Sequence, residues 1–149
     1  RNLTEPSLSS LRKLSAALQL PLYFFLDDDI PQTQVIRADQ RRKLAIPGSE
    51  IVYEYLSPVT MLEAEPPMLE MILFHLNAKC WSREDYVRHD VAEECITVLT
   101  GVITVDCLHE EYHLYEGDSV YIRRGIPHKV YNPSNGVATA LICLTPPVH

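Results

Sequence analysis

Histidine is the side chain that most often binds metals or moves protons near neutral pH, and this chain contains six. His109 and His113 flank two glutamates, a set of residue types able to hold a cation. They fall in a predicted hairpin turn, so we interpret them as a polar surface loop. His75 lies within the apolar run 71–76 and is interpreted as a core or barrel-lining side chain.

The cysteines offer a second possible source of chemistry. None is spaced as Cys-x-x-Cys, and all fall in strand-like segments: Cys80, Cys95, Cys107 and Cys143. We therefore interpret them as small hydrophobic side chains of a protein in the reducing cytoplasm, rather than as zinc ligands or disulfides.

Charge is distributed unevenly. The formal net charge is −7, but residues 1–43 carry seven basic and five acidic side chains, whereas residues 44–149 carry six and fifteen. An acidic main body repels nucleic acid, so any contact with DNA must come from the N-terminal side. No apolar run reaches the ~18 residues of a membrane span, so no membrane partner is expected.

The N-terminal part of the chain, residues 1–26, is predicted to be helical from residue 6. Ser7 is a suitable N-cap, leucines recur at helical spacing, and Pro21 separates a second short apolar segment, Leu22–Leu26. Two helices this short cannot bury their apolar stripes alone, so they need a partner from upstream chain or from another molecule.

Residues 27–49 are predicted to be a linker. The basic cluster 37–43 within it has two interpretations, a contact with phosphate or a solvated strap or edge strand, and we favour the second. From residue 50 to residue 149 the apolar period changes to two, with turn signals between short strands. This pattern predicts an antiparallel sandwich or barrel. The predicted strands are Ile51–Leu56, Met68–Leu76, Cys95–Thr100, Val102–Cys107, Tyr112–Tyr115, Ser119–Ile122 and Val137–Leu144.

Two motifs identify the barrel more closely. Residues 117–132 resemble the second cupin motif, G-x5-P-x-G-x2-H-x3-N, at Gly117, Gly125, His128 and Asn132, with Arg123 in place of proline. The first cupin motif, G-x5-H-x-H-x3-4-E-x6-G, is half present. Its second histidine, its glutamate and its last glycine are matched, while Trp81 and Val87 replace the first glycine and the first histidine. The matched residues are His89, Glu94 and Gly101.

The resemblance implies a mainly β protein with a cupin-type antiparallel β-barrel (a double-stranded β-helix or jelly roll) over residues 50–149. The helical segment 1–26 resembles the closing helices of a phage-repressor-type helix-turn-helix domain. The chain as a whole therefore resembles bacterial transcriptional regulators that join such a domain to a C-terminal cupin sensor. Because the first residue is not Met and the recognition helix would precede Arg1, we expect a fragment that binds DNA weakly or not at all.

The resemblance also implies where a ligand would bind. Metal-binding cupins usually supply three histidines and one glutamate, and this chain keeps His89, Glu94 and His128. These three could still hold one divalent metal, namely zinc, iron or nickel. Alternatively, the loss of the histidine at Val87 marks a pocket that binds an organic molecule, with the same residues as polar anchors. Tyr121 is the fourth predicted pocket residue.

The function implied is sensing of a small-molecule effector by a homodimer whose helix-turn-helix heads bind DNA through the missing N-terminal segment. No catalytic residue is assigned. The alternative is a metal-dependent cupin enzyme, an oxygenase or isomerase, for which Glu93 is the one spare carboxylate. The charge of the effector stays open, because the acidic body favours a cation whereas Arg123 and Arg124 favour an anion.

Overall fold

The computed structural model describes residues 6–18, 25, 33–45, 50–59 and 67–148. The chain divides into two compact units, residues 1–34 and 35–149. In the first unit, helix α1 spans Leu8–Leu18. The predicted cap is confirmed, because Ser7 Oγ accepts a hydrogen bond from the Ser10 N–H at 3.2 Å. No α1 residue is buried. The predicted second helix lies almost entirely outside the described residues.

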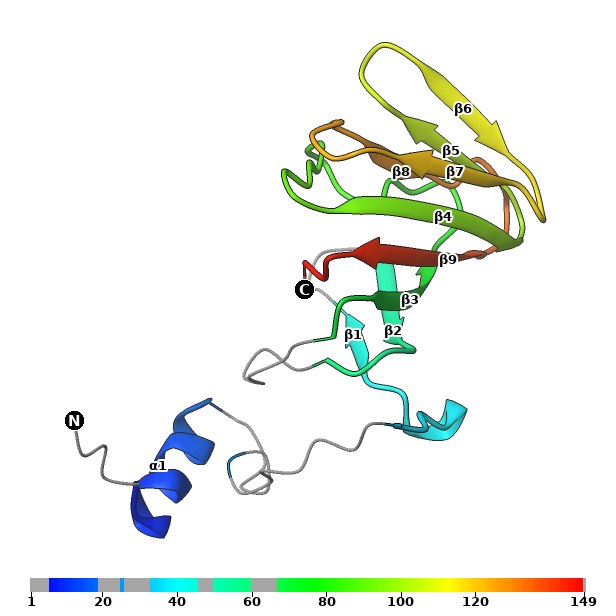
Figure 1. Ribbon diagram of the computed structural model, residues 1–149. Coiled ribbons are helices and arrows are strands. Elements are labelled where there is room, and N and C mark those ends of the chain that lie inside the picture. Colours follow the sequence, from blue (N-terminus) through cyan, green and yellow to red (C-terminus); the bar gives the residue numbers. More distant parts are fainter. Residues whose placement is uncertain (1–5, 19–24, 26–32, 46–49, 60–66, 149) are drawn as a thin grey trace. The chain divides into compact units, whose positions relative to one another are not determined.

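The second unit consists of two antiparallel sheets (Figure 1). The larger sheet has the strand order β1-β2-β3-β9-β4-β7 and the smaller has the order β6-β5-β8. A short 3-10 helix, η2, spans Ala38–Gln40. The strands are β1 Lys43–Ala45, β2 Ile51–Tyr55, β3 Glu70–Leu76, β4 Glu93–Thr100, β5 Ile103–Asp106, β6 Glu111–Leu114, β7 Ser119–Ile122, β8 Lys129–Tyr131 and β9 Ala138–Thr145.

The core lies between the two sheets and follows from the period of two in the sequence. Alternate residues of β3 and β9 are buried, and the register pairs Ile72 of β3 directly with Ile142 of β9. Buried residues of the smaller sheet, Ile103 and Val105 among them, belong to the same hydrophobic cluster. The predicted antiparallel barrel is therefore confirmed, and its central strands have one face inside and one face outside.

Two strands lie outside the list of predicted strands. β1 lies in the segment 27–49 that we expected to be a linker, where the favoured interpretation of residues 37–43 was a solvated strap or an edge strand, and it adds an edge strand to β2. All three of its residues are exposed, so no apolar alternation marked it. β8 lies inside the second cupin motif, and its three residues are too few for a periodic pattern to appear.

Gly101 makes the turn from β4 to β5 and has a φ of +84°. A Cβ atom there would lie 3.2 Å from the Ala138 Cα, closer than such atoms normally approach. Gly117 also has a positive φ, but a Cβ atom there would meet open space. Substitutions at the two glycines therefore distinguish the cost of a left-handed backbone from the cost of a steric contact.

We expect Gly101→Ala to destabilise the barrel by more than Gly117→Ala does. Gly117→Ala should cost only the left-handed backbone penalty, about 1–2 kcal/mol, whereas Gly101→Ala adds the contact with β9. The free energy of unfolding from urea denaturation measures both. Equal losses would show that β9 moves aside at no cost.

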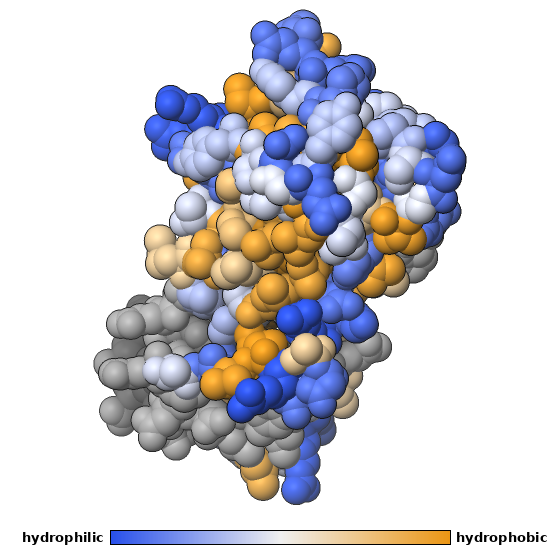
Figure 2. All heavy atoms as spheres, turned by 90° about the vertical axis from the view of Figure 1, so that its right-hand side faces the viewer, coloured by the Kyte–Doolittle hydropathy of each residue, from blue (hydrophilic) through white to orange (hydrophobic). Residues whose placement is uncertain are grey.

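The barrel surface carries apolar areas. Figure 2 shows hydrophobic side chains gathered in a band on one face, bordered by hydrophilic ones. Exposed large apolar side chains on or beside the larger sheet include Leu44, Val52, Leu99 and Val137. Areas of this kind often mark contacts with other molecules. Among the described residues, no helix has the length and hydrophobicity needed to cross a bilayer.

Candidate functional site

Three separate segments bring the two imidazoles and the carboxylate of the cupin motifs together. Glu94 is on β4, where alternation turns its side chain to the inner face, and its neighbours Glu93 and Cys95 are less buried. His128 comes directly before β8 and exchanges two backbone hydrogen bonds of 2.9 Å with Val87. His89, two residues after Val87, is thereby placed beside His128.

The cluster is compact and largely buried. The Glu94 Oε2 atom lies 3.0 Å from His128 Nε2 and 3.4 Å from His89 Nε2. The side chains of Glu94 and His128 are only 6% and 4% exposed. His128 Nδ1 donates to the Ile126 carbonyl at 3.1 Å, and since a carbonyl can only accept, this bond fixes the hydrogen on Nδ1. The Nε2 atom is consequently the one directed at Glu94.

These contacts change the acidities of the cluster. Burial raises the pKa of the Glu94 carboxyl, but the two imidazoles, His128 first, outweigh it and lower that pKa to about 2. Burial lowers the pKa of His128, yet Glu94 and the Ile126 carbonyl outweigh it and raise that pKa, against the opposing charge of Arg83. The carboxylate is therefore ionised throughout the neutral range.

The cluster has the chemistry of a divalent metal site. Its ligand atoms lie within 4.8 Å of one another. Glu94 Oε2 is buried and, among the described residues, accepts no hydrogen bond despite the two nearby nitrogens. Two nitrogens and one carboxylate oxygen match the two-histidine, one-carboxylate donor set of non-haem iron and also suit zinc. The residues present therefore fit such an ion.

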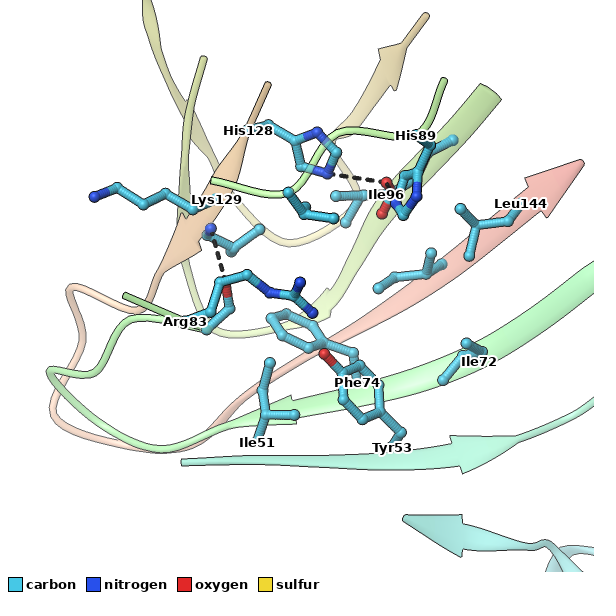
Figure 3. Close-up of a pocket in the computed structure, with 15 residues that line it drawn as sticks. Ile51, Tyr53, Ile72, Phe74, Arg83, His89, Ile96, His128, Lys129 and Leu144 are labelled. Carbon is cyan, nitrogen blue, oxygen red and sulfur yellow. Dashed lines mark hydrogen bonds and ion pairs between the residues drawn. The ribbon is translucent and has the colours of Figure 1, made fainter. Parts of the chain in front are cut away.

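The cluster forms one end of a pocket between the two sheets (Figure 3). The pocket contains about 470 Å³ of empty space, part of it open to solvent. Its walls are mainly apolar and come from β2, β3, β4 and β9 of the larger sheet, from β8 of the smaller one and from the segment before β4. Two aromatic rings, Tyr53 and Phe74, have centroids 6.4 Å apart. The apolar wall is completed by Ile51, Ile72, Val87, Ile96, Val130, Ile142 and Leu144.

The structure brings together three of the four predicted pocket residues. Tyr121 does not join His89, Glu94 and His128: it is 60% exposed, and its hydroxyl donates to Glu93. On β7 it is Ile122 that is buried, so alternation turns Tyr121 outward. It borders a different surface hollow, and its prediction as a pocket residue is corrected accordingly.

The cations at the pocket are also not those suggested by the sequence. Neither Arg123 nor Arg124 lines it, and Arg123 borders the same surface hollow as Tyr121. Arg83 and Lys129 line the pocket instead. No sequence signal marked Arg83, which belongs to the irregular segment between the isolated bridges of Trp81 with Tyr131 and of Val87 with His128.

Asn132, the last residue of the second motif, supports the fold and does not line the pocket. It is fully buried. Its Nδ2 atom donates to the carbonyls of Leu76, Asn77 and Gly136 at 2.8–3.1 Å. Its Oδ1 atom accepts from the backbone N–H and the hydroxyl of Ser134 at 2.9 and 2.7 Å. One side chain thus ties β3 to the loop that precedes β9.

The two facing antiparallel sheets, with a histidine and glutamate cluster at the inner end of the pocket, define a protein of the cupin fold. Residues 73–145 match the sequence profile of the family described as Cupin domain, in agreement with this fold.

Known proteins similar to this chain include regulators. The HTH-type transcriptional regulator PuuR of Escherichia coli K12 is 28% identical over 145 residues, which cover 95% of this chain and 74% of that protein. The cupin domain of an XRE family transcriptional regulator from Enterobacter cloacae superposes with a TM-score of 0.55 at 17% identity, covering 66% of this chain and 99% of that domain.

The fold is shared beyond regulators. The iron(II) form of HppE superposes with a TM-score of 0.62 at 18% identity, covering 95% of this chain and 77% of that one. At such identity the likeness concerns the fold alone.

Proposed function

We propose that residues 50–149 are the effector-sensing module of a DNA-binding transcriptional regulator, with DNA bound through an N-terminal helix-turn-helix segment. One observation carries the proposal: a largely apolar pocket ends in a buried polar cluster, within a chain similar over 95% of its length to a regulator. Apolar walls bury the body of a small molecule, and a few polar groups fix its orientation.

We also propose that His89, Glu94 and His128 hold one divalent metal ion, namely zinc, iron or nickel. The buried Glu94 Oε2 atom without a hydrogen bond supports this proposal. Such an ion would supply a Lewis-acidic anchor for an oxygen or nitrogen atom of the effector. The protein residues hold the ligand atoms in place, since the Ile126 carbonyl fixes the orientation of the His128 ring.

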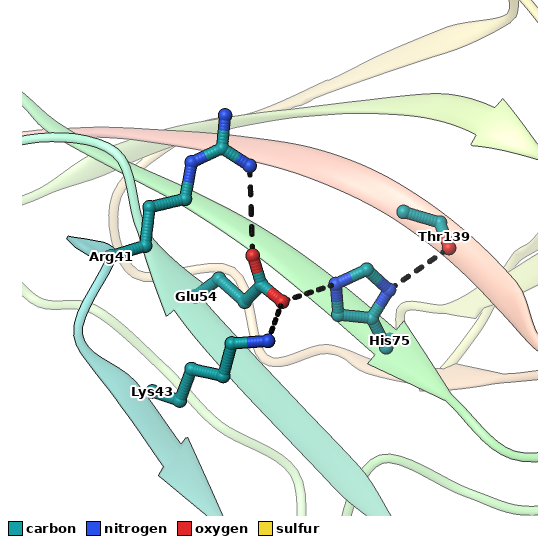
Figure 4. Close-up of polar contacts among 5 residues, drawn as sticks. All are labelled: Arg41, Lys43, Glu54, His75 and Thr139. Atoms are coloured by element: carbon teal, nitrogen blue, oxygen red, sulfur yellow. Dashed lines mark hydrogen bonds and ion pairs between the residues drawn. The ribbon is translucent and has the colours of Figure 1, made fainter. Parts of the chain in front are cut away.

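A charge cluster on the outer face connects the pocket wall with the segment leading to the N-terminal unit (Figure 4). Glu54, next to the pocket residue Tyr53 on β2, lies 2.7 Å from Lys43 Nζ and 3.5 Å from Arg41 Nη1. The contact with Lys43 lowers the pKa of Glu54 most, against burial. His75 extends the cluster, with Nε2 3.7 Å from Glu54 and Nδ1 3.0 Å from the Thr139 hydroxyl.

A shift of β2 on ligand binding would therefore reach residues 41–43 directly. Binding can bias the DNA-binding heads only if the effector prefers one arrangement of β2 and this segment over another. We propose that the regulator acts as a homodimer, since two-fold operators match two-fold proteins, and the exposed apolar band of the barrel is a suitable contact surface.

The double variant His89→Ala/His128→Ala tests the sensing function. A thermal-shift screen of metabolites first identifies compounds that raise the melting temperature of the parent protein. The double variant is expected to show no such rise with these compounds, while it retains the β-sheet circular dichroism spectrum. The variant His109→Ala/His113→Ala, with two histidines of the β5–β6 hairpin changed, is the matched control and should keep the response. Unchanged affinity in the first variant would remove the pocket assignment.

The enzyme alternative has less support from the geometry. Glu93, the spare carboxylate expected from the sequence, is half-buried and bonded to Tyr121 away from the cluster. Among the described residues, Glu94 is the one carboxylate that lines the pocket. A general acid or base beside the cluster is what an oxygenase or isomerase would need, so we favour binding without turnover.

A further inference from the structure

The sign of the charge in the pocket is opposite to that of the domain around it. Residues 44–149 carry fifteen acidic and six basic side chains. The pocket, in contrast, is lined by two basic residues, Arg83 and Lys129, and by one carboxylate, Glu94, which is already engaged by two imidazoles. Basic side chains at the pocket of an acidic domain favour an anionic ligand at that place.

Lys129 is held away from the cavity. Its Nζ atom lies 4.3 Å from the centre of the Trp81 ring and 4.6 Å from that of Tyr86, so two aromatic faces bind the ammonium group. Figure 3 shows this side chain pointing outward from the pocket. Lys129 therefore shapes the rim and is not available to an occupant.

Arg83 points the other way. In Figure 3 its guanidinium group extends over the Tyr53 and Phe74 rings, into the space between these rings and the histidine cluster. Among the described residues it has no ion-pair partner; the nearest sequence neighbour of the same type, Arg88, is bonded to Asp90 at 2.8 Å. Unlike Lys129, Arg83 presents an unoccupied fork of N–H donors to whatever fills the pocket.

We infer that the effector is a small organic carboxylate, with its carboxylate bound by Arg83 and its apolar body between the isoleucine-rich walls and the aromatic rings. This inference rests on the proposed sensing function and specifies its ligand class. A planar guanidinium group matches a carboxylate in a two-bond geometry. A phosphate dianion fits less well, because Arg83 is the one basic side chain of the described residues that is directed into the pocket, and phosphate sites usually combine several donors.

Three probes that share a benzene ring test the inference: benzoate, benzyl alcohol and benzylamine, each titrated into the full chain by calorimetry. Benzoate is expected to bind at least about tenfold more tightly than the other two, in line with a hydrogen bond to a charged partner. Arg83→Ala should remove that advantage and leave the alcohol within about twofold of its parent affinity, and Arg83→Lys should restore part of it.

Arg88→Ala is the matched control, because Arg88 is an arginine of the same loop that does not line the pocket, and its loss should leave benzoate binding unchanged. The inference would be overturned if benzoate bound no more tightly than benzyl alcohol, or if the Arg83→Ala variant bound benzoate as tightly as the parent protein does. A preference for benzylamine that depends on His89 and His128 would overturn the assignment of a carboxylate ligand, while the proposal of small-molecule sensing would stand.

Discussion

Asn132→Ala is expected to lower the free energy of unfolding of the barrel by about 3–5 kcal/mol, since each buried polar group left without a partner costs about 1–3 kcal/mol. The carbonyls of Leu76 and Asn77 lose the Asn132 donor, the Gly136 carbonyl keeps only the Ser134 hydroxyl, and the Ser134 N–H loses its acceptor. Urea denaturation followed by circular dichroism measures the loss.

Asn135, three residues further along the same loop, provides the control. It is exposed, so Asn135→Ala should change stability by less than about 0.5 kcal/mol, the range of ordinary surface substitutions. Similar losses in the two variants would mean that the loop before β9 tolerates any change and that Asn132 does not hold it to β3.

Zinc binding by the His89, Glu94 and His128 cluster is expected to tighten as the pH rises from about 6 to about 8, because a metal needs the unprotonated Nε2 atom of each histidine. The Glu94 carboxylate raises the pKa of His128 above its ordinary value of 6.5, so protons compete at a higher pH than usual. Glu94 itself, with a pKa of about 2, stays ionised and adds no pH dependence. Calorimetric titration with zinc measures the effect.

The folding stability of the metal-free protein should decrease, rather than increase, as the pH rises over the same range. A histidine whose pKa is raised by folding stabilises the fold below its unfolded pKa, and this contribution is lost as pH rises through the raised value. A carboxyl whose pKa is lowered contributes above its unfolded value of 4.5 and keeps that contribution until pH falls toward 2. The pair therefore stabilises the metal-free barrel most between about 4.5 and about 6.5.

Glu94→Gln separates these effects. Loss of a group that only orients a metal ligand typically weakens metal binding about 10–100-fold, and this variant, which loses a ligand itself, should weaken zinc binding by more than that. It should also remove the pH dependence of metal-free stability that arises from the ion pair with His128. No stoichiometric zinc at about pH 8 would identify the cluster as an anchor for an organic ligand alone.

The sequence predicted the barrel because the barrel depends on a repeated pattern. The long strands β3 and β9 bury every second residue, and the glycines at 101, 117 and 125 all adopt the positive φ values that the motifs required of turns. The cluster of His89, Glu94 and His128 was predictable for the same reason, since each residue has a fixed place in a motif. The position of Asn132 was predicted too, but the hydrogen bonds by which it ties β3 to the loop before β9 were visible only in the structure.

Prediction failed where the sequence pattern left the orientation of a strand, or the structure of an irregular segment, open. Tyr121 and Ile122 are equally suitable neighbours for a pocket, and only the strand's orientation decides between them. Arg83 lies in a segment without periodicity, so no pattern distinguished it from Arg123 or Arg124. The bounds of β1 were not predicted, because an exposed edge strand of three residues has no apolar alternation; the sequence indicated only a solvated strap or an edge strand in this region.

Trp81 is the single tryptophan of the chain. Its ring lies 4.9 Å from Tyr131 and beneath the ammonium of Lys129, a residue of the pocket rim, and it stands two positions from Arg83. Indole fluorescence is sensitive to a neighbouring charge and to solvent, and this indole is 39% exposed. The barrel therefore contains an intrinsic optical probe: we expect Trp81 emission to change when a ligand that displaces Lys129 or Arg83 fills the pocket, so occupancy can be followed without a label.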